Sequence, residues 1–139
     1  PVSMLDVSIR AEILKLMLDL KEKRNLTYLF ITHDLALASE IADRVAVMYA
    51  GEIVELGTAE QVYLSPKHPY TQKLIAAVPT LRTEKKLEFI PGEVPSLINP
   101  PPGCRFHPRC PYKKPVCSKV RPKLIEVEKD HLVACHLYE

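Results

Sequence analysis

The distribution of proline limits the architecture of this 139-residue chain more than any other feature. Nine of the thirteen prolines fall between Pro91 and Pro122. Proline fixes φ and lacks a backbone N–H, so this segment is expected to form neither a long helix nor a broad sheet. We therefore expect regular elements as far as about Pro79. The irregular extension after them has too little apolar surface to build a core of its own.

Four helices are predicted from apolar periodicity and from capping residues. The first begins near Ile9 with Asp6 as its N-cap, and a shorter one follows Asp34. A third begins with a capping box at Thr58, and the fourth runs over residues 68–78. All four are expected in the first part of the chain.

Three strands are predicted between these helices. Residues 27–31 form a short run of β-branched, aromatic and aliphatic side chains, which is typical of a strand buried on both faces in a parallel sheet. Residues 45–49 and 53–56 flank a turn at Gly51 and predict a hairpin, which Gly57 is expected to end. This order of elements predicts the end of an α/β layer structure.

The charge and the glycine content exclude several function classes. A net charge of +2 gives no argument for nucleic acid, because solubility alone accommodates such a balance. No run of 18 apolar residues predicts a membrane span, and no secretory leader is recognised, so a cytosolic setting is expected. Only four glycines occur, the first at Gly51, and none belongs to a phosphate-cradling loop. By itself the sequence is not expected to hold the phosphates of a nucleotide in that way.

The four cysteines are the clearest candidate for a metal-binding site in this sequence. They are Cys104, Cys110, Cys117 and Cys135. In a reducing cytosol, clustered cysteines are more typical of metal ligands than of disulfides. Five, six and seventeen residues separate successive members, whereas zinc knuckles place two residues between paired cysteines. The wider spacing suits an iron–sulfur cluster, while structural zinc and two disulfides stay open as alternatives.

The sequence around these cysteines is basic. No Asp or Glu occurs between Val94 and Ile125. The basic residues there are Arg105, Arg109, Lys113, Lys114, Lys119, Arg121 and Lys123. Such cations would stabilise the negative charge of four thiolates around a cluster, although a solvated basic loop has the same composition. The nearby His107, His131 and His136 are expected at the surface or in supporting contacts rather than as ligands.

Several segments resemble the ATPase subunits of ABC transporters. Residues 1–8 (Pro-Val-Ser-Met-Leu-Asp-Val-Ser) resemble the loop after the Walker B strand, and residues 31–35 (Ile-Thr-His-Asp-Leu) resemble the switch-histidine loop. Residues 42–57 resemble the closing strands of the same ATPase core. Similarity to the oligopeptide and dipeptide importer subfamily extends over residues 68–79, 90–95 and 103–111.

The resemblance implies both a fold class and site residues. The fold would be α/β, with the C-terminal half of an ABC-type P-loop ATPase core over residues 1–80. A small irregular extension rich in cysteine and proline would follow over residues 81–139. His33 would match the catalytic switch histidine, which contacts the γ-phosphate of ATP and the attacking water. Ser3 and Asp6 would lie at the interface where nucleotide and a second subunit meet, with Asp6 as the D-loop aspartate.

Cofactors and partners also follow from the resemblance. The full-length subunit would bind ATP and Mg²⁺, pair with a second ATP-binding subunit and drive membrane permease subunits in the uptake of di- or oligopeptides. An extracytoplasmic peptide-binding protein would take part indirectly, and no nucleic acid would be involved. The subunit would be peripheral, at the cytoplasmic face of the membrane. Members with this cysteine motif hold a [4Fe-4S] cluster.

The resemblance further implies that several parts of the ATPase site are not in this sequence. These are the Walker A loop, the glutamine loop, the signature loop and the catalytic glutamate. The sequence therefore looks like the carboxy-terminal half of a longer subunit. The 139-residue chain alone is expected not to hydrolyse ATP, and either to self-associate or to stay bound to its missing half.

Two competing interpretations come from the residues alone. The first is a stand-alone interaction module that binds metal through its four cysteines and could take nucleic acid. The only aromatic side chains in its basic region would be Phe106 and Tyr112, which make a thin stacking platform. The second concerns His33, which spacing alone would interpret as a partly buried histidine held by a backbone carbonyl or by Asp34.

Overall fold

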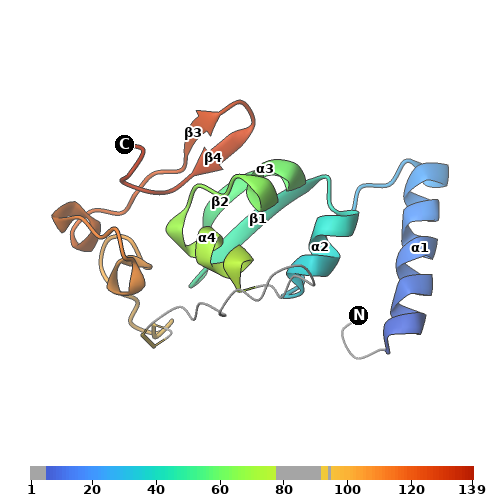
Figure 1. Cartoon of the computed structure of the whole chain (residues 1–139), viewed down its shortest axis with the longest axis horizontal. Coiled ribbons are helices and arrows are strands. Elements are labelled where there is room, and N and C mark those ends of the chain that lie inside the picture. The colour runs from blue at the N-terminus through green and yellow to red at the C-terminus, as the bar shows by residue number, and fades with distance from the viewer. Residues whose placement is uncertain (1–5, 78–91, 94) are drawn as a thin grey trace. The chain divides into compact units, whose positions relative to one another are not determined.

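The computed structural model describes residues 6–77, 92–93 and 95–139, which form helices, short 3₁₀ turns and one sheet (Figure 1). The chain divides into two compact units, residues 1–33 and residues 34–139. The first unit contains helix α1 and the segment after it, and the second contains all other elements. Each unit is described by itself.

Helix α1 spans Val7–Arg24 and confirms the first predicted helix. The Asp6 carboxylate accepts a hydrogen bond from the backbone N–H of Ile9 at 3.4 Å, as expected of an N-cap. At the other end Asn25 takes the left-handed conformation with φ 50°, and its N–H donates to the carbonyl of Lys21. Both ends of the helix are therefore fixed by local chemistry.

The strand predicted over residues 27–31 is not formed. This segment is irregular, and Leu29 and Ile31 are 91% and 85% exposed. A strand buried on both faces needs a hydrogen-bonded neighbour on each side. The sheet in the described part of the chain holds only β1 to β4, none of which includes these residues. The expected burial of this apolar run is therefore wrong.

The second unit is built on an antiparallel sheet with the strand order β1-β2-β4-β3. The strands are β1 (Arg44–Tyr49), β2 (Glu52–Thr58), β3 (Ile125–Glu128) and β4 (His131–Val133). All three neighbouring pairs are antiparallel, so the fold is mixed α/β without a parallel pair among the described strands.

The predicted hairpin is confirmed as β1 and β2. Its turn places Ala50 and Gly51 at φ 49° and 82°, the conformation that two-residue hairpin turns of type I′ require. Gly57 does not end the hairpin as expected, because it pairs with Val45 inside the ladder. A Cβ on Gly57 would lie 3.0 Å from Cδ2 of His131. The glycine therefore permits close approach of a side chain from β4.

The extension joins the sheet through a second hairpin, β3 and β4, whose turn holds Asp130 at φ 61°. Strand β4 pairs with β2 through Glu55 opposite Val133 and Leu56 opposite Leu132. Residues on either side of the predicted boundary at 80 and 81 thus share one sheet. The boundary itself lies outside the described residues.

Three helices complete the second unit, and the first two confirm the predicted capping residues Asp34 and Thr58. They are α2 (Leu35–Ile41), α3 (Ala59–Leu64) and α4 (Pro69–Ala76). Asp34 and Thr58 cap α2 and α3 through their side-chain oxygens, and His68 caps α4 through Nδ1. The predicted end of the last helix at Val78 lies outside the described residues. Local chemistry thus fixes where each of these helices begins.

The core of this unit brings the two parts of the sequence together. Phe106 from the extension is 1% exposed and packs edge-on against Tyr49, with ring centroids 5.1 Å apart. Val47 from β1, Val54 from β2 and Val62 from α3 complete the buried cluster. A segment without a core of its own is therefore held by the core of the hairpin and its helices.

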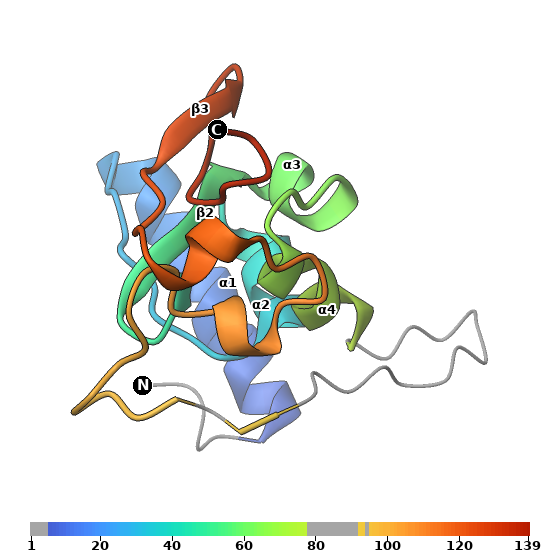
Figure 2. The same ribbon diagram turned by 90° about the vertical axis from the view of Figure 1, so that its left-hand side faces the viewer.

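The described residues of the proline-rich segment form only short 3₁₀ turns, as the composition predicts. They are η1 (His107–Arg109) and η2 (Pro115–Ser118). Figure 2 shows them as two short orange coils joined by irregular backbone.

Candidate functional site

The four cysteines lie in the second unit and come from three places in the fold. Cys104 and Cys110 flank η1, Cys117 lies in η2, and Cys135 follows β4. Cys117 and Cys135 are buried, whereas Cys104 and Cys110 are half-buried. All four are free thiols, and they are called the cysteine group below.

The thiols of the cysteine group lie close enough to interact electrostatically. Burial raises the pKa of Cys104 to about 11, and the other three thiols add to the rise. Burial also raises the pKa values of Cys110 and Cys135, with further contributions from their neighbours in the group. Every pair within the group interacts in this way. The structure therefore places the four predicted cysteines near one another. Because their pKa values are raised, the thiols of Cys104, Cys110 and Cys135 stay protonated near neutral pH.

A backbone contact joins two loops of the group. The N–H of Cys104 donates to the carbonyl of Cys117 at 2.8 Å. The preceding Gly103 has φ 68°, and a Cβ there would lie 2.4 Å from the same carbonyl oxygen. Only glycine fits both the backbone conformation and the space at this position.

The chain after Cys135 wraps over the η2 segment. Nε2 of His136 donates to the carbonyl of Val120 at 2.9 Å, and Nζ of Lys114 donates to the carbonyl of His136 at 2.7 Å. The carboxylate of Glu139 contacts Nδ1 of His136. His136 is thus a buried supporting residue, in line with the expectation from sequence.

Two of the basic residues near the cysteines, Arg105 and Arg121, form ion pairs beside the turn between β1 and β2. Nε of Arg105 and Nη2 of Arg121 lie 2.5 Å and 2.7 Å from Oε1 of Glu52. Arg105 also donates to the carbonyl of Ala50. These contacts tie the extension to the hairpin and show that part of the basic composition is structural.

The described residues give no direct support to a metal centre. No three or more His, Cys, Asp or Glu side chains among residues 6–77, 92–93 and 95–139 form a group that could hold a metal ion. Zinc needs four ligands at short distances around one ion, which this arrangement does not fit.

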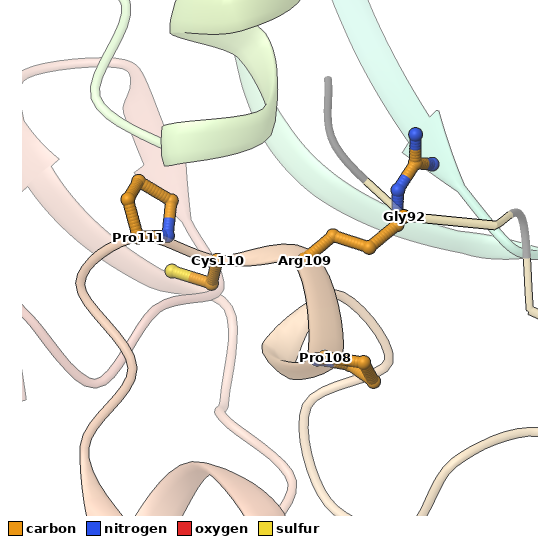
Figure 3. Close-up of a pocket in the computed structure, with 5 residues that line it drawn as sticks. All are labelled: Gly92, Pro108, Arg109, Cys110 and Pro111. Carbon is orange, nitrogen blue, oxygen red and sulfur yellow. The ribbon is translucent and has the colours of Figure 1, made fainter.

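A shallow depression of about 240 Å³ lies beside the cysteine group (Figure 3). Gly92, Pro108, Arg109, Cys110 and Pro111 line it. The Cys110 thiol and the Arg109 guanidinium point in different directions there, with Arg109 reaching toward Gly92. Cys110 is therefore the member of the group that borders this depression.

The residues predicted for the nucleotide site lie in the first unit. His33 is exposed and occupies a bend at the end of that unit, so it is not the partly buried histidine of the competing interpretation. Asp6 is exposed at the start of α1, where it serves as the N-cap. Ser3 lies outside the described residues. The roles of these three residues in nucleotide binding stay predictions.

Sequence reasoning missed one polar contact of the second unit. Glu55 and His131 are both 0% exposed, and Nε2 of His131 lies 2.8 Å from Oε1 of Glu55. The sequence places His131 at the surface or in a supporting contact and does not single out Glu55. One feature of the sequence could have indicated this contact. Glu55 lies between Val54 and Leu56 in an apolar strand, where a buried charged residue needs a partner.

The nucleic-acid interpretation gains nothing from the aromatic residues. Phe106 belongs to the core, which leaves only Tyr112 exposed of the two candidates. No helix in the part of the chain that the structure describes is long and apolar enough to cross a membrane.

Comparison with known proteins identifies relatives over the whole chain. Residues 54–117 match the family model described as "Oligopeptide/dipeptide transporter, C-terminal region". The oligopeptide transport ATP-binding protein AppF of Bacillus subtilis is 49% identical over 142 residues, which cover 99% of this chain and 43% of that protein. The dipeptide transport ATP-binding protein DppF of Escherichia coli is 49% identical over 97% of this chain and 41% of its own length.

A third relative extends the same finding. The dipeptide transport ATP-binding protein DppD of Caldanaerobacter subterraneus is 47% identical over 100% of this chain and 43% of its own length. The chain spans about two fifths of the length of these curated relatives. The competing interpretation of a stand-alone metal-binding module is not supported by these relatives.

Proposed function

Because the chain belongs to the family of oligopeptide and dipeptide transport ATP-binding proteins, we propose that it is part of a subunit that hydrolyses ATP to drive peptide uptake. The observation that carries this proposal is the 49% identity to AppF over 99% of the chain. That alignment includes both the segment around His33 and the cysteine-containing extension. The mixed α/β fold with its antiparallel closing hairpin is consistent with it.

In the proposed subunit His33 acts at the phosphate end of ATP. Hydrolysis of this bond depends on positioning and on charge stabilisation, and an imidazole can orient the attacking water and contact the γ-phosphate. Exposure of His33 leaves its ring accessible for this role. Mg²⁺ bound together with ATP would supply positive charge that neutralises the phosphates. Asp6 and Ser3 are assigned to the interface between two ATP-binding subunits.

The proposed partners follow from the same assignment. A second ATP-binding subunit completes the nucleotide site, and membrane permease subunits receive the conformational change. An extracytoplasmic peptide-binding protein delivers the peptide, and the subunit itself is peripheral at the cytoplasmic face of the membrane. The 139-residue chain alone is not expected to turn over ATP.

For the cysteine group we propose ligation of a [4Fe-4S] cluster. Support comes from the all-thiol donor set, from the mutual electrostatic interaction of the thiols, and from burial of Cys117 and Cys135. Such a cluster would add a cross-link between η1, η2 and β4 in a segment that has no core of its own. Its proposed role is structural.

Uptake by cells tests the transport proposal. Deleting the gene of the parent subunit should abolish uptake of a labelled tripeptide and leave uptake of labelled free alanine unchanged. Restoring the intact gene should restore peptide uptake. Normal peptide uptake in the deletion strain, with no related transporter expressed, would overturn the proposal.

Metal analysis tests the cluster proposal. The parent subunit purified without oxygen should be brown and contain iron and acid-labile sulfide in equal amounts. The variant Cys110→Ser should lose both. A colourless protein that contains zinc, or no metal at all, would contradict the assignment.

A further inference from the structure

The carboxylate of Glu55 joins three segments that lie far apart in the sequence. Oε1 accepts hydrogen bonds from the backbone N–H of Lys67 at 2.7 Å and from Nε2 of His131 at 2.8 Å. Oε2 accepts from the backbone N–H of His68 at 2.9 Å. Strand β2, the start of α4 and strand β4 thus meet at one side chain.

All of these contacts are shielded from water. Glu55 and His131 are 0% exposed, and His68 is 1% exposed. A buried carboxylate is tolerated only when hydrogen-bond donors satisfy it, and its removal leaves those donors unpaired. Truncating Glu55 would therefore cost more than the loss of one surface interaction.

The ladder between β2 and β4 is short, which makes the side-chain contact important. Only Glu55 opposite Val133 and Leu56 opposite Leu132 are paired, and one further hydrogen bond joins the N–H of Ala134 to the carbonyl of Val54. So few backbone bonds give a weak attachment unless side chains reinforce it. The Glu55–His131 contact lies at the start of β4, and Val133 at its end is fully buried.

Strand β4 in turn determines where Cys135 lies. Cys135 follows the hydrogen-bonded Ala134 directly, whereas the other three cysteines belong to the segment between residues 104 and 117. If β4 separates from β2, Cys135 is held only from its C-terminal side, through the contacts of His136 with the η2 segment, while the contact between Cys104 and Cys117 stays in place. The position of Cys135 is thus the one that depends on the β2–β4 attachment.

We propose that Glu55 is a positioning residue for the cysteine group: by holding His131, it keeps β4 on β2 and Cys135 beside the other three thiols. Any metal function of the group rests on the proposed function above. The positioning role itself concerns the thiols and holds for the metal-free protein as well.

Alkylation of the metal-free chain tests this role. Each thiol is labelled with iodoacetamide over time and quantified by mass spectrometry. In Glu55→Gln, Cys135 is expected to react about tenfold faster than in the wild type, because an amide cannot accept from all three donors. The rates of Cys104 and Cys117 should change much less. Unchanged Cys135 reactivity, or equal acceleration of all four thiols, would overturn the proposal.

A matched control is available on the neighbouring strand. Glu128 lies 2.5 Å from Nζ of Lys67 and is half-exposed, and its Oε2 lies 3.8 Å from Nδ1 of His131. The variant Glu128→Gln makes the same chemical change outside the buried contact. It should leave the reactivity of Cys135 as in the wild type, and acceleration equal to that in Glu55→Gln would contradict the assignment to Glu55.

A second pair of variants covers the case in which Glu55→Gln does not fold. His131→Gln keeps an N–H donor for the carboxylate, whereas His131→Leu removes it. Protection of Cys135 should be largely retained in His131→Gln and lost in His131→Leu. Equal loss in both would overturn the proposal. Because no cluster is present in this assay, its outcome is separate from that of the metal analysis.

Discussion

Nε2 of His131 donates to Oε1 of Glu55 over 2.8 Å, at a position where neither side chain is exposed to solvent. The two partners lie 76 positions apart in the sequence. The contact therefore joins the hairpin that resembles an ATPase core to the last strand of the cysteine-containing extension. It helps to hold the hairpin at the end of the extension, β3 and β4, on the sheet.

The first prediction concerns the dependence of stability on pH. Burial lowers the pKa of His68 to about 4, below its ordinary value of 6.5. Between these values the unfolded chain binds a proton that the folded chain does not, so stability falls as the pH falls. The loss should approach about 3 kcal/mol below pH 4. Urea unfolding at pH 7 and pH 4.5 measures it.

The control for this prediction is His68→Asn, which keeps a side-chain cap for α4 but does not titrate. Its stability should decrease less than that of the wild type between pH 7 and pH 4.5. An identical decrease in both proteins would show that other groups cause the effect.

The second prediction compares two glycines with positive φ. Gly103 and Gly92 have φ 68° and 83°, so alanine is strained at both. A Cβ on Gly103 would meet the carbonyl of Cys117 at 2.4 Å, whereas one on Gly92 would meet only the side chain of Arg109, at 3.3 Å. Gly103→Ala should therefore reduce the free energy of unfolding by about 2 kcal/mol more than Gly92→Ala. Equal losses in urea titrations would argue against the close contact.

The third prediction concerns thiol reactivity in the metal-free chain. Because burial raises the pKa of Cys104 to about 11, its thiolate fraction at pH 8 should be about 100-fold lower than that of an unperturbed cysteine. Its alkylation rate should keep rising with pH up to about 11. A plateau near pH 9 in a series of labelling rates would contradict the burial of this thiol.

The fourth prediction concerns the exposed apolar segment of the first unit. Leu29 and Ile31 are almost fully exposed, and surfaces of this kind associate in water. The isolated chain should form concentration-dependent oligomers in light scattering. The double variant Leu29→Ser and Ile31→Ser should reduce their average mass, whereas Leu64→Ser, which changes an exposed leucine of α3, should not. If the double variant and Leu64→Ser had the same average mass, the surface through which the chains associate would lie outside residues 29–31.

Features set by nearby residues could be predicted from the sequence. The caps at Asp6, Asp34 and Thr58 and the turn at Gly51 all depend on side chains or dihedral angles within a few residues. The absence of long elements among the described residues of the proline-rich segment was predictable for the same reason, because proline acts on its own backbone.

Features set by distant partners could not be predicted. Residues 27–31 have the composition of a buried strand, but a strand also requires neighbours that the sequence pattern does not specify. A glycine at position 57 is typical of the end of a strand. Nothing in the neighbouring sequence indicates that the side chain of His131 lies close to it instead. Likewise, the cysteine spacing predicts a metal group, and the structure gathers the thiols without a set among the described residues that fits one metal ion.

We propose above that this chain belongs to a subunit in which ATP hydrolysis drives peptide uptake, with His33 at the γ-phosphate. The most direct measurement is ATP hydrolysis in a single turnover by the parent subunit, assembled with its permease in proteoliposomes, for the wild type and His33→Ala. The variant should bind ATP with unchanged affinity and hydrolyse it at least about 100-fold more slowly, as expected when a residue that orients the water and contacts the phosphate is lost. Hydrolysis at the wild-type rate in His33→Ala would contradict the account.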